Sequence, residues 1–234
     1  MIMKGRGVFF FGSAVLSVFL CVSMLAPLPA EAAPHADFRA GVEYRDGDRA
    51  PRKGGSAKVS GELARLDVRL GKAGYFTLLV DMQGGRIQVL SQKLRAYVET
   101  SVEGDAHSWR ELVRGASSVL LPQTLGMVSF QERSCQEQGR EMWNGFEAVK
   151  SRCVFTLGFM GSYRDITFDV WESSDIVPFP LKVEVLEDGR TRGGSACLAD
   201  MEPVKSPEED FLVPEKYTRF TSVLDLILYA LSAF

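Results

Sequence analysis

The chain has 234 residues, of which 46% are apolar and 24% are charged, and its formal net charge is −3. This apolar content is too high for an intrinsically disordered protein. The small acidic excess argues against a nucleic-acid-binding protein, for which a basic face is expected.

The first residues have the layout of a secretory signal peptide. Two basic residues come before an apolar run over residues 8–25, and two prolines follow it. Small residues satisfy the A-x-A rule best for cleavage after Ala32, and less well for cleavage after Ala36. We therefore predict a signal peptide over residues 1–32 and a single domain over residues 33–234, exported to the periplasm and long enough to bury a core.

Residues 1–32 allow two other interpretations. The run over residues 8–25 is close to the roughly 18 residues that a membrane span needs, so an uncleaved anchor stays open. Lipid attachment at Cys21 is disfavoured because Leu20, a large residue, stands where a lipobox has a small one. After cleavage we expect no integral membrane protein, since the last apolar run, residues 223–234, is too short to span a bilayer.

Alternating apolar and polar residues predict strands through the first half of the chain. The segment between the first two of them, residues 44–61, is rich in glycine and charge and is predicted to be a mobile loop. The expected strands are residues 38–45, 65–70, 75–81, 86–90 and 95–100.

The pattern changes at Ser108, where the spacing to Glu111 fits a capping box. Apolar residues then recur at helical spacing until Pro122, which predicts one short internal helix over residues 108–121. Strand patterns resume from Met127, with an Asn144-Gly145 hairpin among the turns.

The rest of the chain is predicted to be strands, a connection and a helix. Residues 181–185 and 195–201 read as partner strands around a turn at residues 187–189, and residues 205–215 read as a surface connection. A helix beginning near Thr221 should close the sheet. Strands joined by tight turns form an antiparallel meander, so the predicted class is mainly β, within α+β.

Three cysteines remain after the leader is removed: Cys135, Cys153 and Cys197. Cys135 and Cys153 flank the Asn144-Gly145 turn almost symmetrically, although a regular two-residue hairpin centred there would place residue 135 opposite residue 154. We expect a Cys135–Cys153 disulfide, with three free thiols as the alternative. The loop it closes would contribute about 3 kcal/mol in the chain-entropy model.

Several short stretches resemble one protein superfamily: FRAGVEYR, RLDVRL, RAYVET, EMWNGFEAV, DVWESSDIVPFPLKVEVLEDG and EDFLVPEKYTRF. They are similar to the superfamily of periplasmic lipoprotein carriers (LolA/LolB-like), in an uncharacterised secreted branch, over roughly residues 38–217. The matching positions are Tyr97, Glu99, Asn144, Gly145, Trp171, Pro180, Lys182, Asp188, Gly189, Phe211, Pro214 and Tyr217. Relatives often have a cysteine where this chain has Ala148, so their disulfide pattern does not carry over.

The resemblance implies a curved antiparallel sheet, an unclosed β-barrel or half-barrel, with a short internal helix and a C-terminal helix. In the carriers, helices form a lid over an apolar concave face that receives acyl chains. The superfamily is known for binding rather than chemistry, so the resemblance brings no catalytic residues.

The residues themselves give little sign of catalysis. The histidines, His35 and His107, stand far apart without ligand spacing, which predicts no metal site and no cofactor. The sequence has no G-x-S-x-G motif. The nearest carboxylate cluster, Glu99, Glu103 and Asp105, is interpreted as strand-end and loop charge. We therefore predict no catalytic residues and no enzyme activity.

The predicted function is a periplasmic, non-catalytic binding protein for a lipid, an acylated protein or another hydrophobic ligand. The candidate lining residues are Trp109, Leu112, Phe168, Val170, Val183 and Leu226. The chain's tryptophans could line such a face or pack in the core, and both readings stay open. The alternative function is an envelope interaction module that holds a protein partner through a sheet edge or the loop at residues 45–58.

Overall fold

The computed structural model describes residues 37–47, 49–69, 74–101, 128–159, 162–187, 190–221 and 229. All the strands named in this part of the chain belong to one twelve-stranded sheet, in the order β12-β6-β5-β4-β3-β2-β1-β11-β10-β9-β8-β7. Every neighbouring pair is antiparallel except β12 and β6, which run parallel. The elements are β1 (Phe38–Arg45), β2 (Arg52–Ser60), β3 (Leu63–Arg69), β4 (Tyr75–Asp81), β5 (Arg86–Ser91), β6 (Ala96–Ser101), β7 (Val128–Trp143), β8 (Phe146–Phe159), β9 (Ser162–Glu172), β10 (Lys182–Glu187), β11 (Arg190–Glu202), the 3-10 helix η3 (Glu208–Phe211) and β12 (Thr218–Phe220).

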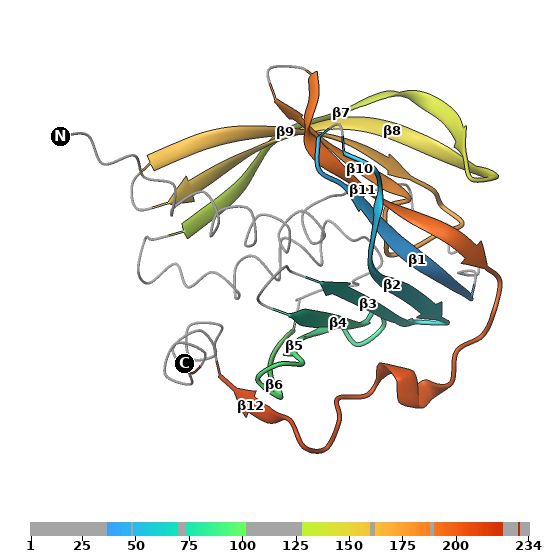
Figure 1. Cartoon of the computed structure of the whole chain (residues 1–234), viewed down its shortest axis with the longest axis vertical. Helices are drawn as coiled ribbons and strands as arrows, with labels where there is room; N and C mark the ends of the chain where they lie inside the picture. Colours follow the sequence, from blue (N-terminus) through green and yellow to red (C-terminus); the bar gives the residue numbers. More distant parts are fainter. Residues whose placement is uncertain are drawn as a thin grey trace.

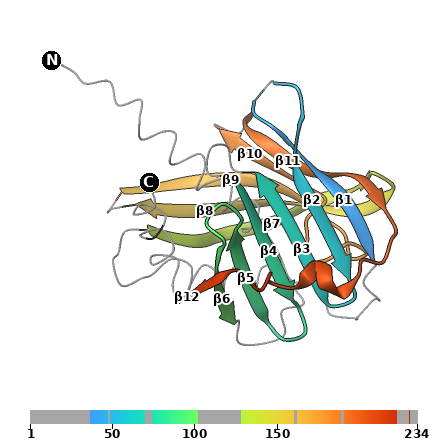
Figure 2. The same ribbon diagram turned by 60° about the horizontal axis from the view of Figure 1, so that its bottom comes forward.

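The sheet bends strongly along its strand order. Strands β7 to β9 lie on one side of the molecule and β3 to β6 lie on the other, with β1, β2, β10 and β11 joining them (Figures 1 and 2). The two end strands, β7 and β12, do not pair with each other. The fold is therefore the unclosed, mainly antiparallel half-barrel that the sequence and the resemblance predicted.

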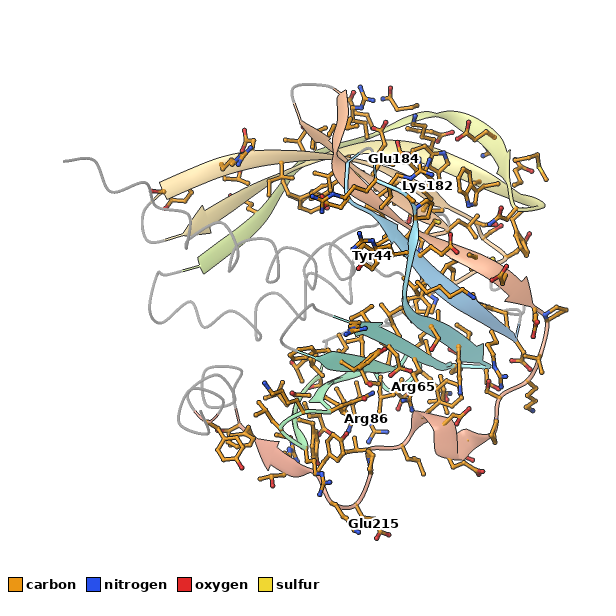
Figure 3. All side chains as sticks on the ribbon, viewed as in Figure 1. Tyr44, Arg65, Arg86, Lys182, Glu184 and Glu215 are labelled. Carbon is orange, nitrogen blue, oxygen red and sulfur yellow. A yellow bond between two sulfur atoms is a disulfide. The ribbon has the colours of Figure 1, made fainter. Side chains whose placement is uncertain are left out.

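Alternation along the strands separates an inner face from an outer face. In β3, Ala64 and Leu66 are buried, whereas Arg65 between them lies on the outer side of the sheet, as does Arg86 of β5 (Figure 3). The register carries this inner face across the sheet, because each apolar residue is paired with an apolar or small residue of the next strand. Its buried members include Phe38, Ala40, Val42, Ala57, Val59, Ala64, Leu66, Leu78, Val80, Ile87, Phe155, Phe168, Val170, Val183 and Leu198.

The prediction of a mobile loop over residues 44–61 was wrong, because half of this segment, Arg52–Ser60, is strand β2. Its glycines are needed for close packing. A Cβ on Gly54 would lie 2.6 Å from the Tyr44 ring, and one on Gly55 would lie 1.8 Å from the carbonyl oxygen of Asp67 in β3. Glycine within a strand often marks such a close approach, so a composition typical of loops here belongs to a tightly packed strand.

The predicted strands at the N-terminal half and around the Asn144-Gly145 hairpin are confirmed as β1, β3 to β6 and β7 to β11. The predicted helix over residues 108–121 lies outside the described residues. The same holds for most of the predicted C-terminal helix, of which the structure describes only Tyr229, in helical conformation.

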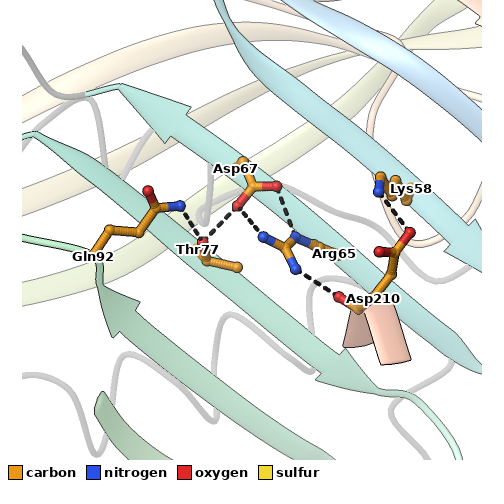
Figure 4. Close-up of polar contacts among 6 residues, drawn as sticks. All are labelled: Lys58, Arg65, Asp67, Thr77, Gln92 and Asp210. Atoms are coloured by element: carbon orange, nitrogen blue, oxygen red, sulfur yellow. Dashed lines mark hydrogen bonds and ion pairs between the residues drawn. The ribbon is translucent and has the colours of Figure 1, made fainter. Parts of the chain in front are cut away.

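The segment after β11, predicted to be a surface connection, runs across the outer side of the sheet and is anchored there. We call residues 203–217 the strap. Lys58 of β2 forms a 2.6 Å ion pair with Asp210, and Arg65 of β3 donates a 2.6 Å hydrogen bond to the Asp210 carbonyl oxygen (Figure 4). Phe211 is buried. The strap leads into β12, whose first amide, that of Thr218, donates to the carbonyl of Arg95 beside β6.

The outer face beneath the strap is organised by a chain of polar contacts. Arg65 is paired with Asp67 at 2.7 Å, Asp67 accepts a hydrogen bond from Thr77, and Gln92 donates to the Thr77 hydroxyl at 3.3 Å (Figure 4). The hydrogen bond from Lys58 lowers the pKa of Asp210 from its usual value. Lys58 and Arg65 thus fix the strap to β2 and β3, and the polar chain continues from Arg65 to β4 and to Gln92 after β5.

The β7–β8 hairpin is joined by a disulfide between Cys135 and Cys153, which face each other in the ladder. A regular ladder counted from the turn would place Cys135 opposite Val154 instead. The ladder shifts by one residue at Gln138, which has no partner in β8. The next residue, Gly139, has a φ of 144°, which glycine adopts readily and other residues adopt only with strain. This β-bulge brings the two sulfurs to the same face of the sheet.

The bulge yields a prediction about register. Replacing Gly139 by valine should lower the free energy of unfolding by about 1–3 kcal/mol, because valine is strained at this φ. Removing Gln138 in the same variant should restore stability, because the shorter strand pairs Cys135 with Cys153 without a bulge. Chemical denaturation measures the free energy of unfolding of each variant. Thiol titration of the unfolded protein shows whether the Cys135–Cys153 disulfide has formed. Equal stability of the two variants would contradict the assigned register.

Candidate functional site

Three of the six predicted lining residues lie together on the inner face. Val183 of β10 is paired with Val170 of β9, and Phe168 of β9 is paired with Cys153 of β8. Phe155 packs edge-on against Phe168, with ring centroids 5.8 Å apart. The other predicted lining residues, Trp109, Leu112 and Leu226, lie outside the described residues.

Phe168, Val170 and Val183 are buried, with exposed fractions of 1%, 0% and 5%. They therefore form the floor of the inner face. Elsewhere on the same face the apolar side chains are less covered: Val68 of β3 and Val89 of β5 are only partly buried and pack against the core. Alternation along a strand predicts which side of the sheet Val68 and Val89 face, but it does not predict how deeply other segments bury them. The sequence therefore did not identify these two valines as lining residues.

The tryptophans of the hairpin and of β9 lie on the outer face. Trp171 is paired in the ladder with Lys182 and alternates with the inward-facing Val170. Its ring lies 6.4 Å from that of Trp143, and the Lys182 ammonium lies 4.3 Å and 4.4 Å from the two ring centroids. The Trp171 indole N–H donates to Glu141. For these two tryptophans the structure thus supports packing and not a lining of the inner face.

An ion cluster around a buried carboxylate lies beside these rings on the same face. Asp169 of β9 accepts hydrogen bonds from the Arg152 guanidinium at 2.7 Å and 2.8 Å, and the Lys150 ammonium lies 3.2 Å away. Burial raises the pKa of the Asp169 carboxyl, but the hydrogen bonds from Arg152 and Lys150 outweigh it, so the pKa is lowered overall. The cluster joins β8 to β9 and has the character of a structural tie.

The tip of the β7–β8 hairpin is fixed against the middle of the sheet. Asn144, one of the two turn residues, donates a side-chain hydrogen bond of 3.0 Å to the carbonyl oxygen of Leu198 in β11. The left-handed backbone of Asn144 and Gly145 suits the two-residue turn. The Asn-Gly pair therefore makes both the turn and a tertiary contact, and the sequence motif predicted only the turn.

The described residues give no sign of a reactive centre. Cys197 of β11 is a free, half-buried thiol, and burial, followed by the nearby Glu43, raises its pKa, which disfavours the nucleophilic thiolate. Within the described ranges no group of three or more His, Cys, Asp or Glu residues is placed to hold a metal ion. In the same ranges, no helix has the length and apolar character needed to cross a membrane.

No protein-family model and no curated protein sequence matches the chain. Solved structures align with most of it at low identity. An uncharacterised conserved protein from Thermus thermophilus is 10% identical, with 80% of this chain and 90% of that chain covered and a TM-score of 0.43. The Pseudomonas aeruginosa MucA/MucB complex gives 13% identity, coverage of 87% and 62%, and a TM-score of 0.35. The Mycobacterium tuberculosis lipoprotein LppX gives 15% identity, coverage of 89% and 100%, and a TM-score of 0.30.

Likenesses of this size carry no conclusion about function. The functional argument therefore rests on the residues of this chain.

The Asp169 cluster predicts how stability depends on pH. Because the pKa of Asp169 is lower in the folded than in the unfolded chain, its stabilisation is complete above about pH 5 and is lost as the pH falls below the usual value of about 3.9. Replacing Asp169 by asparagine should cost about 1–2 kcal/mol at pH 7, since its partners are partly exposed. Urea denaturation between pH 7 and pH 3 should show that the free energy of unfolding changes less with pH in the variant than in the unaltered protein. An identical pH dependence in the two proteins would show that Asp169 has no perturbed pKa.

Proposed function

We propose that this chain is an exported, non-catalytic binding protein that holds an apolar ligand, a lipid or the acyl group of an acylated protein, against the inner face of its half-barrel. In this proposal residues 1–32 are removed on export, and residues 33–234 act in the periplasm as a single domain. The ligand rests on the floor formed by Phe168, Val170 and Val183. Trp109, Leu112 and Leu226 stay proposed as further lining residues.

One observation carries the proposal: a continuous apolar face on the concave side of a sheet that does not close. An antiparallel sheet usually buries one face and leaves the other to water, and here the outer face holds the ion pairs and the strap. A closed barrel of this many strands would pair its first and last strands, whereas among the described residues β7 and β12, the two ends of this sheet, do not pair with each other. The partly buried Val68 and Val89 extend the apolar floor beyond the core.

The first test is native mass spectrometry of the exported chain purified from a bacterial periplasm, before and after solvent extraction. The mass should show cleavage after residue 32 and a bound lipid or acyl group that extraction removes. A ligand-free mass, with no uptake of an added fluorescent fatty acid such as cis-parinaric acid, would contradict the proposal. That result would favour a protein-binding module of the envelope instead.

A pair of valine variants tests the face that is used. Replacing Val89 on the inner face by glutamine should weaken cis-parinaric acid binding roughly tenfold, because the polar group removes apolar contact worth about 1–2 kcal/mol. Val154 of β8 is also half-buried but faces outward, beside Thr167, and Val154→Gln should leave binding unchanged. Fluorescence titration measures both affinities. Equal loss in the two variants would show that the inner face is not the binding surface.

A further inference from the structure

The strand register gathers the charged turns of the protein at two opposite ends of the sheet. One end holds the turns β1–β2, β3–β4, β5–β6, β8–β9 and β10–β11, since Arg45 is paired with Ser195, Arg69 with Tyr75 and Ser91 with Ala96. The opposite end holds the β2–β3 and β4–β5 turns and the β7–β8 hairpin. In Figure 1 the end of β8 and the start of β9 lie to the left, and the β7–β8 hairpin lies to the right.

The first of these ends has more exposed cations than carboxylates: of its exposed carboxylates, Asp46 pairs with Arg49, and Asp165 lies beside Arg164 in the chain. Its exposed cations come from four separate turns, and within the described residues none of the following five has a salt-bridge partner: Arg45, Arg52, Arg69, Arg95 and Arg164. The opposite end carries exposed carboxylates, among them Asp175, Glu202, Glu208 and Glu209, and its exposed cations Arg86 and Arg140 are paired with carboxylates. Because the whole chain has a net charge of −3, the basic end reflects a separation of charge and not an overall excess.

The same end also carries exposed tyrosines. Tyr44, Tyr75 and Tyr163 have exposed fractions of 40%, 44% and 73%. Tyr75 lies under the Arg69 guanidinium, with 5.9 Å between the guanidinium carbon and the ring centroid. Of the other exposed large apolar side chains, Met142, Val204 and Leu212 are not aromatic. The remaining exposed tyrosine, Tyr229, packs against Phe220 with ring centroids 5.1 Å apart.

Arginine and tyrosine together suit one kind of surface. Arginine forms paired hydrogen bonds with phosphate, and a tyrosine ring favours the membrane–water boundary, where its body is apolar and its hydroxyl stays wet. Arginine and tyrosine are also enriched at protein interfaces, so an acidic protein is the competing occupant that the experiment has to separate from a bilayer. We propose that this end, which we call the basic end, docks onto an anionic lipid bilayer, with the arginines on lipid phosphates and the tyrosines at the headgroup level.

The inference goes beyond the proposed function and does not depend on it. Ligand binding uses the inner face, whereas docking uses the turn tips at one end of the strands. If both hold, docking brings the open half-barrel to the surface from which an acyl chain is taken or to which it is delivered. The two are separated by experiment, since vesicle binding and fatty-acid uptake are different measurements.

The test is co-sedimentation of the exported chain with vesicles of phosphatidylcholine alone or with about one third phosphatidylglycerol. We expect binding to the anionic vesicles only. Binding should weaken as the salt concentration rises from about 0.1 M to 0.5 M, because dissolved ions reduce the range of the attraction between opposite charges. A surface cation contributes about fivefold to such binding. Reversal of three charges, Arg52→Glu with Arg69→Glu and Arg164→Glu, should therefore reduce partitioning by far more than tenfold.

Matched variants make the test specific. The variant Arg86→Glu with Arg140→Glu and Lys205→Glu makes the same change in net charge away from the basic end and should retain most of the binding. Replacing Tyr75 and Tyr163 by serine should weaken binding severalfold at constant charge. All these positions are exposed, and thermal unfolding verifies that each variant folds.

Three results would overturn the proposal: no binding to anionic vesicles, equal loss in the two charge variants, or unchanged binding of the tyrosine variant. Capture of an acidic protein without any vesicle binding would assign the basic end to a protein partner instead. Vesicle binding without fatty-acid uptake would support the docking surface and contradict the proposed function. Uptake without vesicle binding would do the reverse.

Discussion

The structure depends on the continuity of one face across a sheet that does not close. Each strand offers alternate side chains to opposite sides, and the ladder of backbone hydrogen bonds holds neighbouring strands in the register that keeps apolar residues on the same side. A slip of one residue between any two strands would turn half of the inner face outward. The β-bulges, the close packing at Gly54 and Gly55, and the Asn144 contact with β11 all serve this register.

The two faces consequently have different tasks. The inner face supplies most of the buried apolar side chains of the described strands and is the proposed surface for an apolar ligand. The outer face is held by polar ties that cross strands: the Asp169 cluster between β8 and β9, and the Lys58 and Arg65 contacts that fix the strap. Because these ties involve partly exposed groups, each contributes modestly. Their effect is to hold the curvature and the strap, while apolar burial supplies most of the stability.

The two ends of the strands differ as much as the two faces. Turns that are far apart in the sequence, from Arg45 to Arg164, lie at the same end of the strands. The reason is that neighbouring strands run in opposite directions, so every second turn of a meander is at the same end. Separation of basic and acidic turns orients such a molecule in the field of a charged surface. In the two proposals, the apolar inner face takes the ligand and the turns at the basic end take the charged surface.

Local patterns were sufficient where the physics is local. Alternation located β1, β3 to β6 and most of the later strands, and the Asn-Gly pair located the hairpin. The Cys135–Cys153 pairing was expected from near symmetry about that turn, but symmetry alone gave residue 154 as the partner position, because nothing in the sequence shows a bulge at Gln138. The segment at residues 44–61 was misread for a related reason: glycine marks either a loose loop or a tight approach, and only the neighbouring strand decides which.

By itself, then, the sequence determined the alternation, the turns, the class of fold and the apolar character of residues such as Phe168, Val170 and Val183. The tertiary structure alone decided which face Trp143 and Trp171 occupy, how deeply each valine is buried, and which turns share an end of the sheet. These properties arise from pairing between strands that are distant in the chain. Which strands pair depends on the free energy of burial and hydrogen bonding summed over the whole sheet. A short stretch of sequence is therefore insufficient to predict the pairing.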